Sequence, residues 1–236
     1  MDPVAQQFLA ELDAANDELP GSVQAGLAMC GDDVVPALIE RLVDRERPIT
    51  TRAFSAQVLA QLKVAAGWRA MVDVIAGGSV VMLPLLGRIL AHGGIPAAEA
   101  ALSRAEDEEL VAEIRIVLAG LAVRAAGAEW AAARVAPIAR MTFLEAPVPA
   151  LALMRTAPSP SYQAVLMENP ELMRADPEAA LDVLVSLQPE GSDAHRFVEA
   201  LQSGIDRGID RVLASVTEGL EPAVAEPSAA LLRDEP

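Results

Sequence analysis

The stretch VVPALIERLVDRERPITTRAFSAQVLAQL, residues 34–62, decides the fold class. Its apolar residues recur every four positions in two stripes: Val34, Leu38 and Leu42, then Phe54, Val58 and Leu62. This spacing places each stripe on one face of a helix. Asp32 or Asp33 is suited to cap the first helix. The stretch therefore predicts two amphipathic helices joined by a short turn.

The composition of the whole chain extends this interpretation. Apolar residues make up 53% of the 236 residues and aromatic residues only 3%. Alanine and leucine favour closely packed helices, whereas strands are usually richer in tyrosine, phenylalanine, tryptophan and threonine. We therefore predict an all-α protein.

Glycine pairs, and capping residues followed by proline, mark the expected helix boundaries. Helices are expected to stop at Gly77-Gly78 and Gly93-Gly94, and to start at Ser159-Pro160, Asn169-Pro170 and Asp176-Pro177. The resulting helices form four pairs, over residues 34–62, 68–90, 95–121 and 129–154. Leu62, Leu90 and Leu118 recur 28 residues apart, which is typical of stacked helical hairpins that share a core.

Two segments carry a family resemblance. Residues 34–39 (VVPALI) and 52–59 (RAFSAQVL) resemble a HEAT-type repeat of the armadillo and PBS-lyase kind, and the resemblance extends over roughly residues 20–156. It implies a right-handed α-solenoid of about four to six hairpins, in which the second helices line the concave side.

The C-terminal third differs from the predicted array. Residues 165–173 and 178–184 resemble helical segments of actinobacterial proteins with tetratricopeptide-like or caspase-like (CHAT) modules. We expect residues 1–156 to form the repeat array, residues 157–217 a helical cap packed on it, and residues 218–236 a disordered acidic tail. An apolar stripe in the cap either docks a partner or packs on the last repeat; it contains Ile205, Ile209 and Val212.

The charge balance argues against two classes of partner. The formal net charge is −16, from 34 acidic and 18 basic residues, and Lys63 is the only lysine. Nucleic acid and anionic membranes attract basic surfaces, so we expect neither as a partner. The N-terminus has no basic segment typical of a signal peptide, and no apolar run is long enough to span a bilayer. We expect a cytoplasmic protein.

A catalytic centre is not apparent in the sequence. His92 and His195 are the only histidines and lie in no metal-binding spacing, and Cys30 is the only cysteine. We expect His92 to cap a helix end and Cys30 to be buried. The acidic run at residues 106–109 is expected to form a solvated first helical turn. We predict no enzyme activity, no metal and no cofactor.

Three arginines are candidate binding residues. Arg52, Arg88 and Arg115 fall on the predicted second helices of successive hairpins. If those helices line a concave face, the arginines form a ladder that meets an acidic partner. In the alternative, each pairs with an acidic residue of the next repeat and stiffens the stack.

These observations favour a non-catalytic scaffold or adaptor that binds a protein partner. One alternative is a component or immunity protein of a bacterial defence or signalling system, whose acidic surface complements a basic partner. Another is a HEAT-like enzyme, such as a DNA glycosylase or lyase. The charge and the scarcity of aromatic residues depart from the glycosylase pattern. The sequence leaves the partner and the oligomeric state open.

Overall fold

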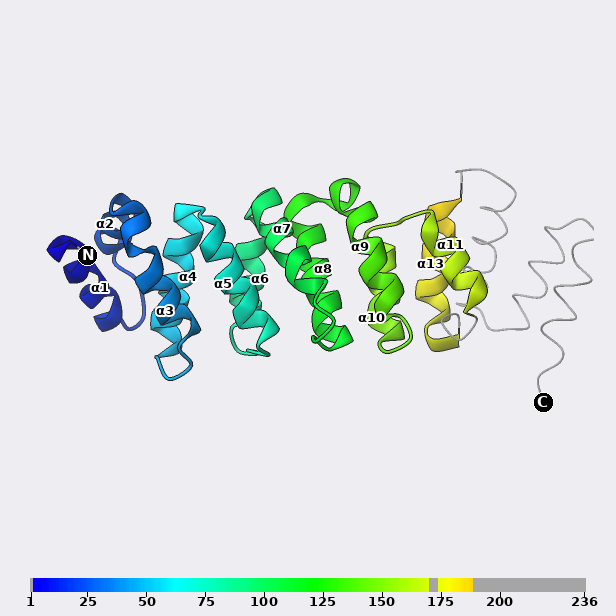
Figure 1. Ribbon diagram of the computed structural model, residues 1–236, viewed down its shortest axis with the longest axis horizontal. Coiled ribbons are helices and arrows are strands. Elements are labelled where there is room, and N and C mark those ends of the chain that lie inside the picture. Colours follow the sequence, from blue (N-terminus) through cyan, green and yellow to red (C-terminus); the bar gives the residue numbers. More distant parts are fainter. Residues whose placement is uncertain (1, 170–173, 189–236) are drawn as a thin grey trace, which may run out of the picture. The chain divides into compact units, whose positions relative to one another are not determined.

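The computed structural model describes residues 2–169 and 174–188, and every regular element among them is helical (Figure 1). The predicted all-α class is therefore confirmed for this part of the chain. The α-helices are α1 (Pro3–Ala14), α2 (Gly21–Met29), α3 (Val35–Val43), α4 (Ile49–Leu62), α5 (Ala65–Ala76), α6 (Leu83–Ala91), α7 (Gly94–Ala105), α8 (Ala112–Ala126), α9 (Ala128–Thr142), α10 (Pro147–Thr156), α11 (Ser161–Glu168) and α13 (Pro177–Leu187), with a short 3-10 helix at Gly31–Val34.

The chain divides into two compact units, Met1–Ile138 and Ala139–Pro236. The division falls inside α9, whereas the sequence placed a boundary at residue 156. The four predicted helix pairs correspond to α3 with α4, α5 with α6, α7 with α8, and α9 with α10. The predicted tail at residues 218–236 and most of the predicted cap lie outside the described residues.

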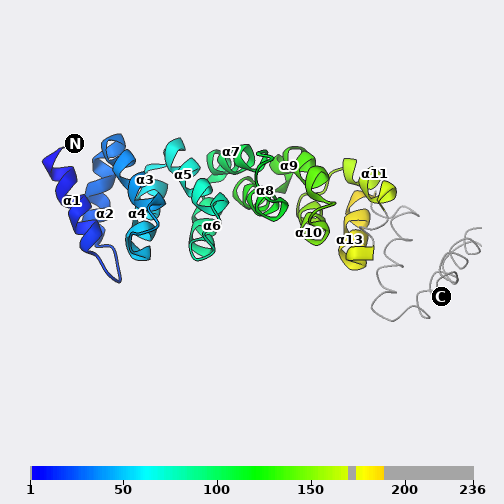
Figure 2. The same ribbon diagram turned by 60° about the horizontal axis from the view of Figure 1, so that its bottom comes forward.

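From α3 to α8, each helix contacts both its neighbour in the chain and the next helix but one. Helices α3, α5 and α7 pack in sequence and form what we call the odd row, while α2, α4, α6 and α8 form the even row. Figure 2 shows α5 and α7 above α4, α6 and α8. The apolar stripes point between the rows, and their fully buried side chains include Leu38, Leu42, Leu59, Met71, Leu86, Leu90 and Leu118.

One polar contact occurs identically in two hairpins. Arg52 Nε in α4 donates to the carbonyl of Leu42, and Arg115 Nε in α8 donates to the carbonyl of Ala105, each at 2.9 Å. Both arginines occupy the fourth position of their helix, and both carbonyls belong to the last turn of the preceding helix. Carbonyls there lack an intrahelical partner and carry negative partial charge. Each arginine thus caps the C-terminus of the helix before it.

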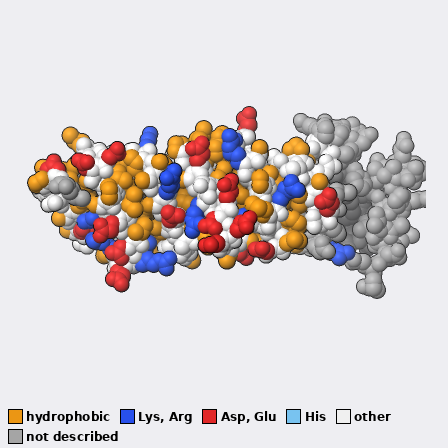
Figure 3. All heavy atoms as spheres, viewed as in Figure 1, with side chains coloured by type: hydrophobic (Ala, Val, Ile, Leu, Met, Phe, Trp, Pro, Cys, Tyr) orange, Lys and Arg blue, Asp and Glu red, His pale blue; other side chains and the backbone are white. Residues whose placement is uncertain are grey.

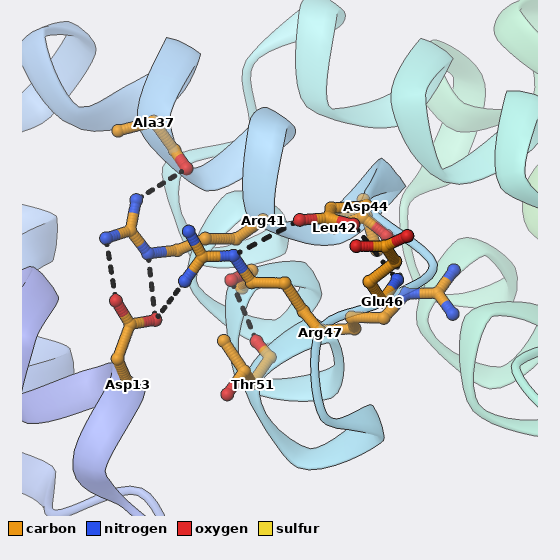
Figure 4. Close-up of polar contacts among 10 residues, drawn as sticks. Asp13, Ala37, Arg41, Leu42, Asp44, Glu46, Arg47 and Thr51 are labelled. Atoms are coloured by element: carbon orange, nitrogen blue, oxygen red, sulfur yellow. Dashed lines mark hydrogen bonds and ion pairs between the residues drawn. The ribbon is translucent and has the colours of Figure 1, made fainter.

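A second pair of contacts recurs at the same 63-residue interval and links successive hairpins. Arg41 in α3 donates from Nε and Nη2 to the two carboxylate oxygens of Asp13, in the last turn of α1, at 3.0 and 2.8 Å (Figure 4). Arg104 in α7 pairs with Asp73 in α5 at 3.2 Å. The two arginines are 63 residues apart, as are Arg52 and Arg115.

The turn between α5 and α6 is built differently. No arginine stands at the fourth position of α6, where the chain has Leu86. Gly77 ends α5, and Gly78 follows with a left-handed φ of 76°. Arg45, from the turn between α3 and α4, donates from Nη2 to the Gly77 carbonyl at 2.7 Å. Here glycine and an arginine from the neighbouring hairpin replace the capping arginine.

The hairpins α3–α4, α5–α6 and α7–α8 begin at Val35, Ala65 and Gly94, which are 30 and 29 residues apart. The arginine contacts recur over two hairpins, after 63 residues. The expectation for the acidic run was wrong. The acidic run 106–109 lies in the turn before α8. There Asp107 accepts the Glu109 N–H at 2.9 Å and pairs with Arg104, so it shapes the turn.

The second unit contains α10, α11 and α13 among its described residues. Helix α13 packs on α10 and α11, and Arg155 pairs with Asp182 at 3.1 Å. The predicted start at Asp176-Pro177 is confirmed, since the Asp176 carboxylate accepts the Ala179 N–H at 3.0 Å. Helix α11 begins one residue later than predicted, with Pro160 as its cap. The predicted start at Asn169-Pro170 falls on the edge of the described residues.

Candidate binding site

The structure places the three candidate arginines on the even row, but in two different roles. Arg52 and Arg115 are only 8% and 7% exposed, and their Nε atoms are engaged by the carbonyls of the preceding helices. Their carbonyl partners lie in the same hairpin, whereas the sequence suggested acidic partners in the next one. A ladder of three exposed arginines is therefore not formed.

Arg88 is the arginine of the three that reaches the surface. It lies in the last turn of α6, is exposed, and has no ion pair within residues 2–169 and 174–188. It lines a hollow of about 730 Å³ on the even-row side of the first unit. We call this hollow the basic pocket; its lining consists of Gln24, Gln57, Ala60, Lys63, Trp68, Leu85, Arg88, Ile89, His92, Gly93, Gly94 and Pro96.

The charge of the basic pocket is opposite to that of the chain. Lys63, Arg88 and His92 line it, and no aspartate or glutamate does, although acidic residues outnumber basic ones almost two to one in the sequence. Lys63 is exposed and, like Arg88, has no ion pair among the described residues. Uncompensated cations in a concave site attract anionic groups. On the face seen in Figure 3, by contrast, acidic and basic side chains are interspersed.

Lys63 stands in an unusual backbone conformation. It follows the last residue of α4 with φ 54° and ψ 30°, and it is the only described residue other than glycine with a positive φ. Glycine or asparagine normally occupies such a position, because a side-chain Cβ there costs about 1–2 kcal/mol. The only lysine of the chain is thus held where glycine would be less strained.

Trp68 forms one wall of the basic pocket. It is 4% exposed, and its Nε1–H is buried with no hydrogen-bond partner among the described residues. Gly93 packs against the indole so closely that a Cβ at this position would lie 3.1 Å from two ring atoms and 2.4 Å from Ala97. The wall is therefore fixed by close packing.

His92 caps α6, as predicted. Its Nδ1 lies 2.7 Å from the carbonyl of Arg88. A carbonyl only accepts hydrogen bonds, so in this contact Nδ1 carries the proton and donates it. The contact also fixes the ring at the turn between α6 and α7, beside the side chain of the pocket arginine.

A second hollow, of about 400 Å³, lies on the odd-row side between α5 and α7. Its charged lining residues are balanced: Arg69 and Arg104 against Asp73 and Glu99. Two of them already form the Arg104–Asp73 pair. Because its charges compensate each other, this hollow offers less attraction to a charged ligand than the basic pocket does.

Other candidate residues give no site. The stripe containing Ile205, Ile209 and Val212 lies outside the described residues. Cys30 is only partly buried at the end of α2, so the expectation of a buried cysteine was wrong. Within the described ranges, no group of three metal-ligating side chains comes together, and no helix is long and apolar enough to cross a bilayer.

Comparisons with known proteins show none that is similar to this chain. No family model, no curated protein sequence and no solved structure matches this chain.

Proposed function

We propose that this chain is a non-catalytic α-solenoid scaffold of the HEAT-like type, which binds a protein partner on its even row. The observation that carries the proposal is the basic pocket, because it collects unpaired cations on one side of an otherwise acidic chain. Such a pocket attracts an anionic group and excludes competing cations.

The recurring contacts of the first unit support the solenoid part of the proposal. The capping arginines Arg52 and Arg115, and the linking arginines Arg41 and Arg104, repeat at one interval and in equivalent helices. In solenoids each hairpin contacts only its neighbours, which is the pattern of helix contacts within this unit. A stack of this kind presents one row of helices as a continuous surface for a partner.

Photo-crosslinking tests which row meets the partner. A photoreactive amino acid replaces Gln57 in the even row or Glu99, an exposed residue of α7 in the odd row, and the full chain is irradiated in extract of its native host. We expect a discrete crosslinked protein from position 57 and none from position 99. Crosslinks from position 99 alone, or from neither position, would contradict the proposed function.

We propose that the scaffold acts in the cytoplasm and needs no cofactor, as the sequence predicts. Its oligomeric state is measured in the same preparation by light scattering. A discrete partner that co-elutes with the full chain, at a fixed ratio, is the expected behaviour of an adaptor.

A further inference from the structure

The basic pocket combines charged and apolar surface, which narrows the class of ligand. Lys63, Arg88 and His92 supply positive or chargeable groups, while Leu85 and Ile89 supply apolar area. A small inorganic anion would leave the apolar part unused. A peptide with acidic side chains next to aliphatic ones fills both parts of the site.

The net charge of the chain favours a short acidic peptide over a nucleic acid as the ligand of the pocket. A long polyanion feels the whole net charge of −16, and is repelled by it. A short segment in the pocket is affected mainly by groups within a Debye length, about 8 Å at physiological ionic strength. The residues that line the pocket include no aspartate and no glutamate.

The backbone at Lys63 adds an independent argument. A non-glycine residue held at φ 54° costs folding free energy, and such outliers concentrate at sites where the side chain is needed. The strain brings the only lysine of the chain to the pocket rim, where it makes no ion pair within the described residues. A folding role alone would be served better by glycine.

We propose that the basic pocket binds an acidic peptide segment of the partner, with Lys63 and Arg88 pairing with its carboxylates and Leu85 and Ile89 contacting its aliphatic side chains. This assignment rests on the proposed scaffold function and names the chemistry that its even row recognises.

The test uses the full chain immobilised against a displayed library of random short peptides, at roughly 0.15 M ionic strength to screen the net charge. We expect the selected peptides to be enriched in Asp and Glu next to Leu, Ile or Val. The best peptide is then synthesised and titrated by calorimetry. Replacing its acidic residues with Gln or Asn should abolish the measured heat.

Three variants place the binding site. Arg88→Gln and Lys63→Gly should each weaken binding about tenfold, as expected when a charged hydrogen-bond pair is lost. Arg69→Gln is the matched control, because Arg69 is an exposed arginine that lines the other hollow; it should change affinity less than about twofold. Lys63→Gly relieves the left-handed strain, so it should lose binding while its unfolding midpoint stays equal or rises.

Several outcomes would overturn the assignment: a library without acidic enrichment, an affinity unchanged in both pocket variants, or an equal loss in Arg69→Gln. Photo-crosslinking keeps this failure separate from failure of the scaffold. Because Gln57 lines the pocket, undiminished crosslinking from position 57 in the Arg88→Gln variant would show that the partner is held there without the pairing assigned to Arg88. If no partner crosslinks in the wild-type chain, the scaffold function itself fails.

Discussion

The turns that close the hairpins of the first unit are built in two ways. The turns after α3 and α7 are each closed by a buried arginine from the following helix, Arg52 or Arg115, which caps the preceding helix. The turn after α5 lacks this arginine; it relies on Gly78 and on Arg45 from the neighbouring turn. The same helix packing therefore occurs with two different ways of hydrogen-bonding the carbonyls at a helix end. We expect the two kinds of turn to contribute differently to the free energy of unfolding.

The largest effect is expected from the capping arginines. Arg52→Met or Arg115→Met keeps most of the side-chain volume but leaves a helix-end carbonyl without its charged donor. Each should lower the free energy of unfolding by about 2–3 kcal/mol. Urea denaturation followed by tryptophan fluorescence measures this, since Trp68 and Trp130 are the only tryptophans and both lie in the first unit.

The exposed Arg124 in the last turn of α8 provides the control for this prediction. Arg124→Met should change the free energy of unfolding by less than about 0.5 kcal/mol, as is usual for surface substitutions. Equal effects at Arg52 and Arg124 would show that the recurring hydrogen bond does not stabilise the turn.

A smaller effect is expected in the middle turn. Gly78→Ala forces a Cβ into a left-handed conformation at φ 76° and should cost about 1–2 kcal/mol. Gly77 is the matched control, because its φ of −72° suits any residue. A Cβ at Gly77 would lie 2.9 Å from the flexible end of Arg45 and 3.3 Å from the carbonyl oxygen of Asp73, so Gly77→Ala should cost less than about 1 kcal/mol in the same assay. Equal losses at both positions would rule out backbone strain as the cause.

Arg45 should contribute less than the capping arginines although it also donates to a helix-end carbonyl. Its bond to Gly77 is at the exposed surface, where water replaces it readily. Arg45→Gln should therefore lower the free energy of unfolding by less than about 1 kcal/mol. A loss as large as that of Arg52→Met would mean that the two kinds of turn are equivalent, and that burial does not set the strength of the cap.

Much of this comparison was present in the sequence. Aligning residues 41–63 with 104–126 superimposes Arg41 on Arg104 and Arg52 on Arg115, so the 63-residue interval is visible from charged residues alone. The leucines obscured it, because leucine fills core positions at many places along a helix and does not mark one of them. The helix pairs themselves followed from apolar spacing and glycine punctuation, both of which are local signals.

The basic pocket could not be predicted in the same way. Lys63 and His92 belong to turns that are distant in the sequence, and they meet only because α4 and α6 pack side by side in the even row. Arg88 was singled out, but as one of three equivalent arginines. Arg88 and Arg52 are not equivalent, because Arg52 lies in the first turn of its helix and Arg88 in the last turn of its own. Of the two, only Arg52 therefore reaches a carbonyl of the preceding helix.

The smallest expected effect is on the pH dependence of stability, and it arises from Asp107 in the turn after α7. The hydrogen bond from the Glu109 N–H, helped by the Arg104 side chain, lowers the pKa of Asp107 below its ordinary value of 3.8. A carboxyl with a lowered folded-state pKa stabilises the fold above its unfolded value, and that contribution is lost as the pH falls through the folded value. Asp107→Asn should therefore flatten the acid limb of the stability curve below pH 3.8 and shift the neutral plateau only slightly.

Glu99→Gln, which removes one charge from the middle of α7, is the control for this curve. It matches the change in net charge without touching the turn. If both variants flatten the acid limb equally, the slope reports the overall charge of the chain. If only Asp107→Asn does so, the aspartate of this turn holds its backbone through the carboxylate form, which the glycine turn after α5 has no means to do.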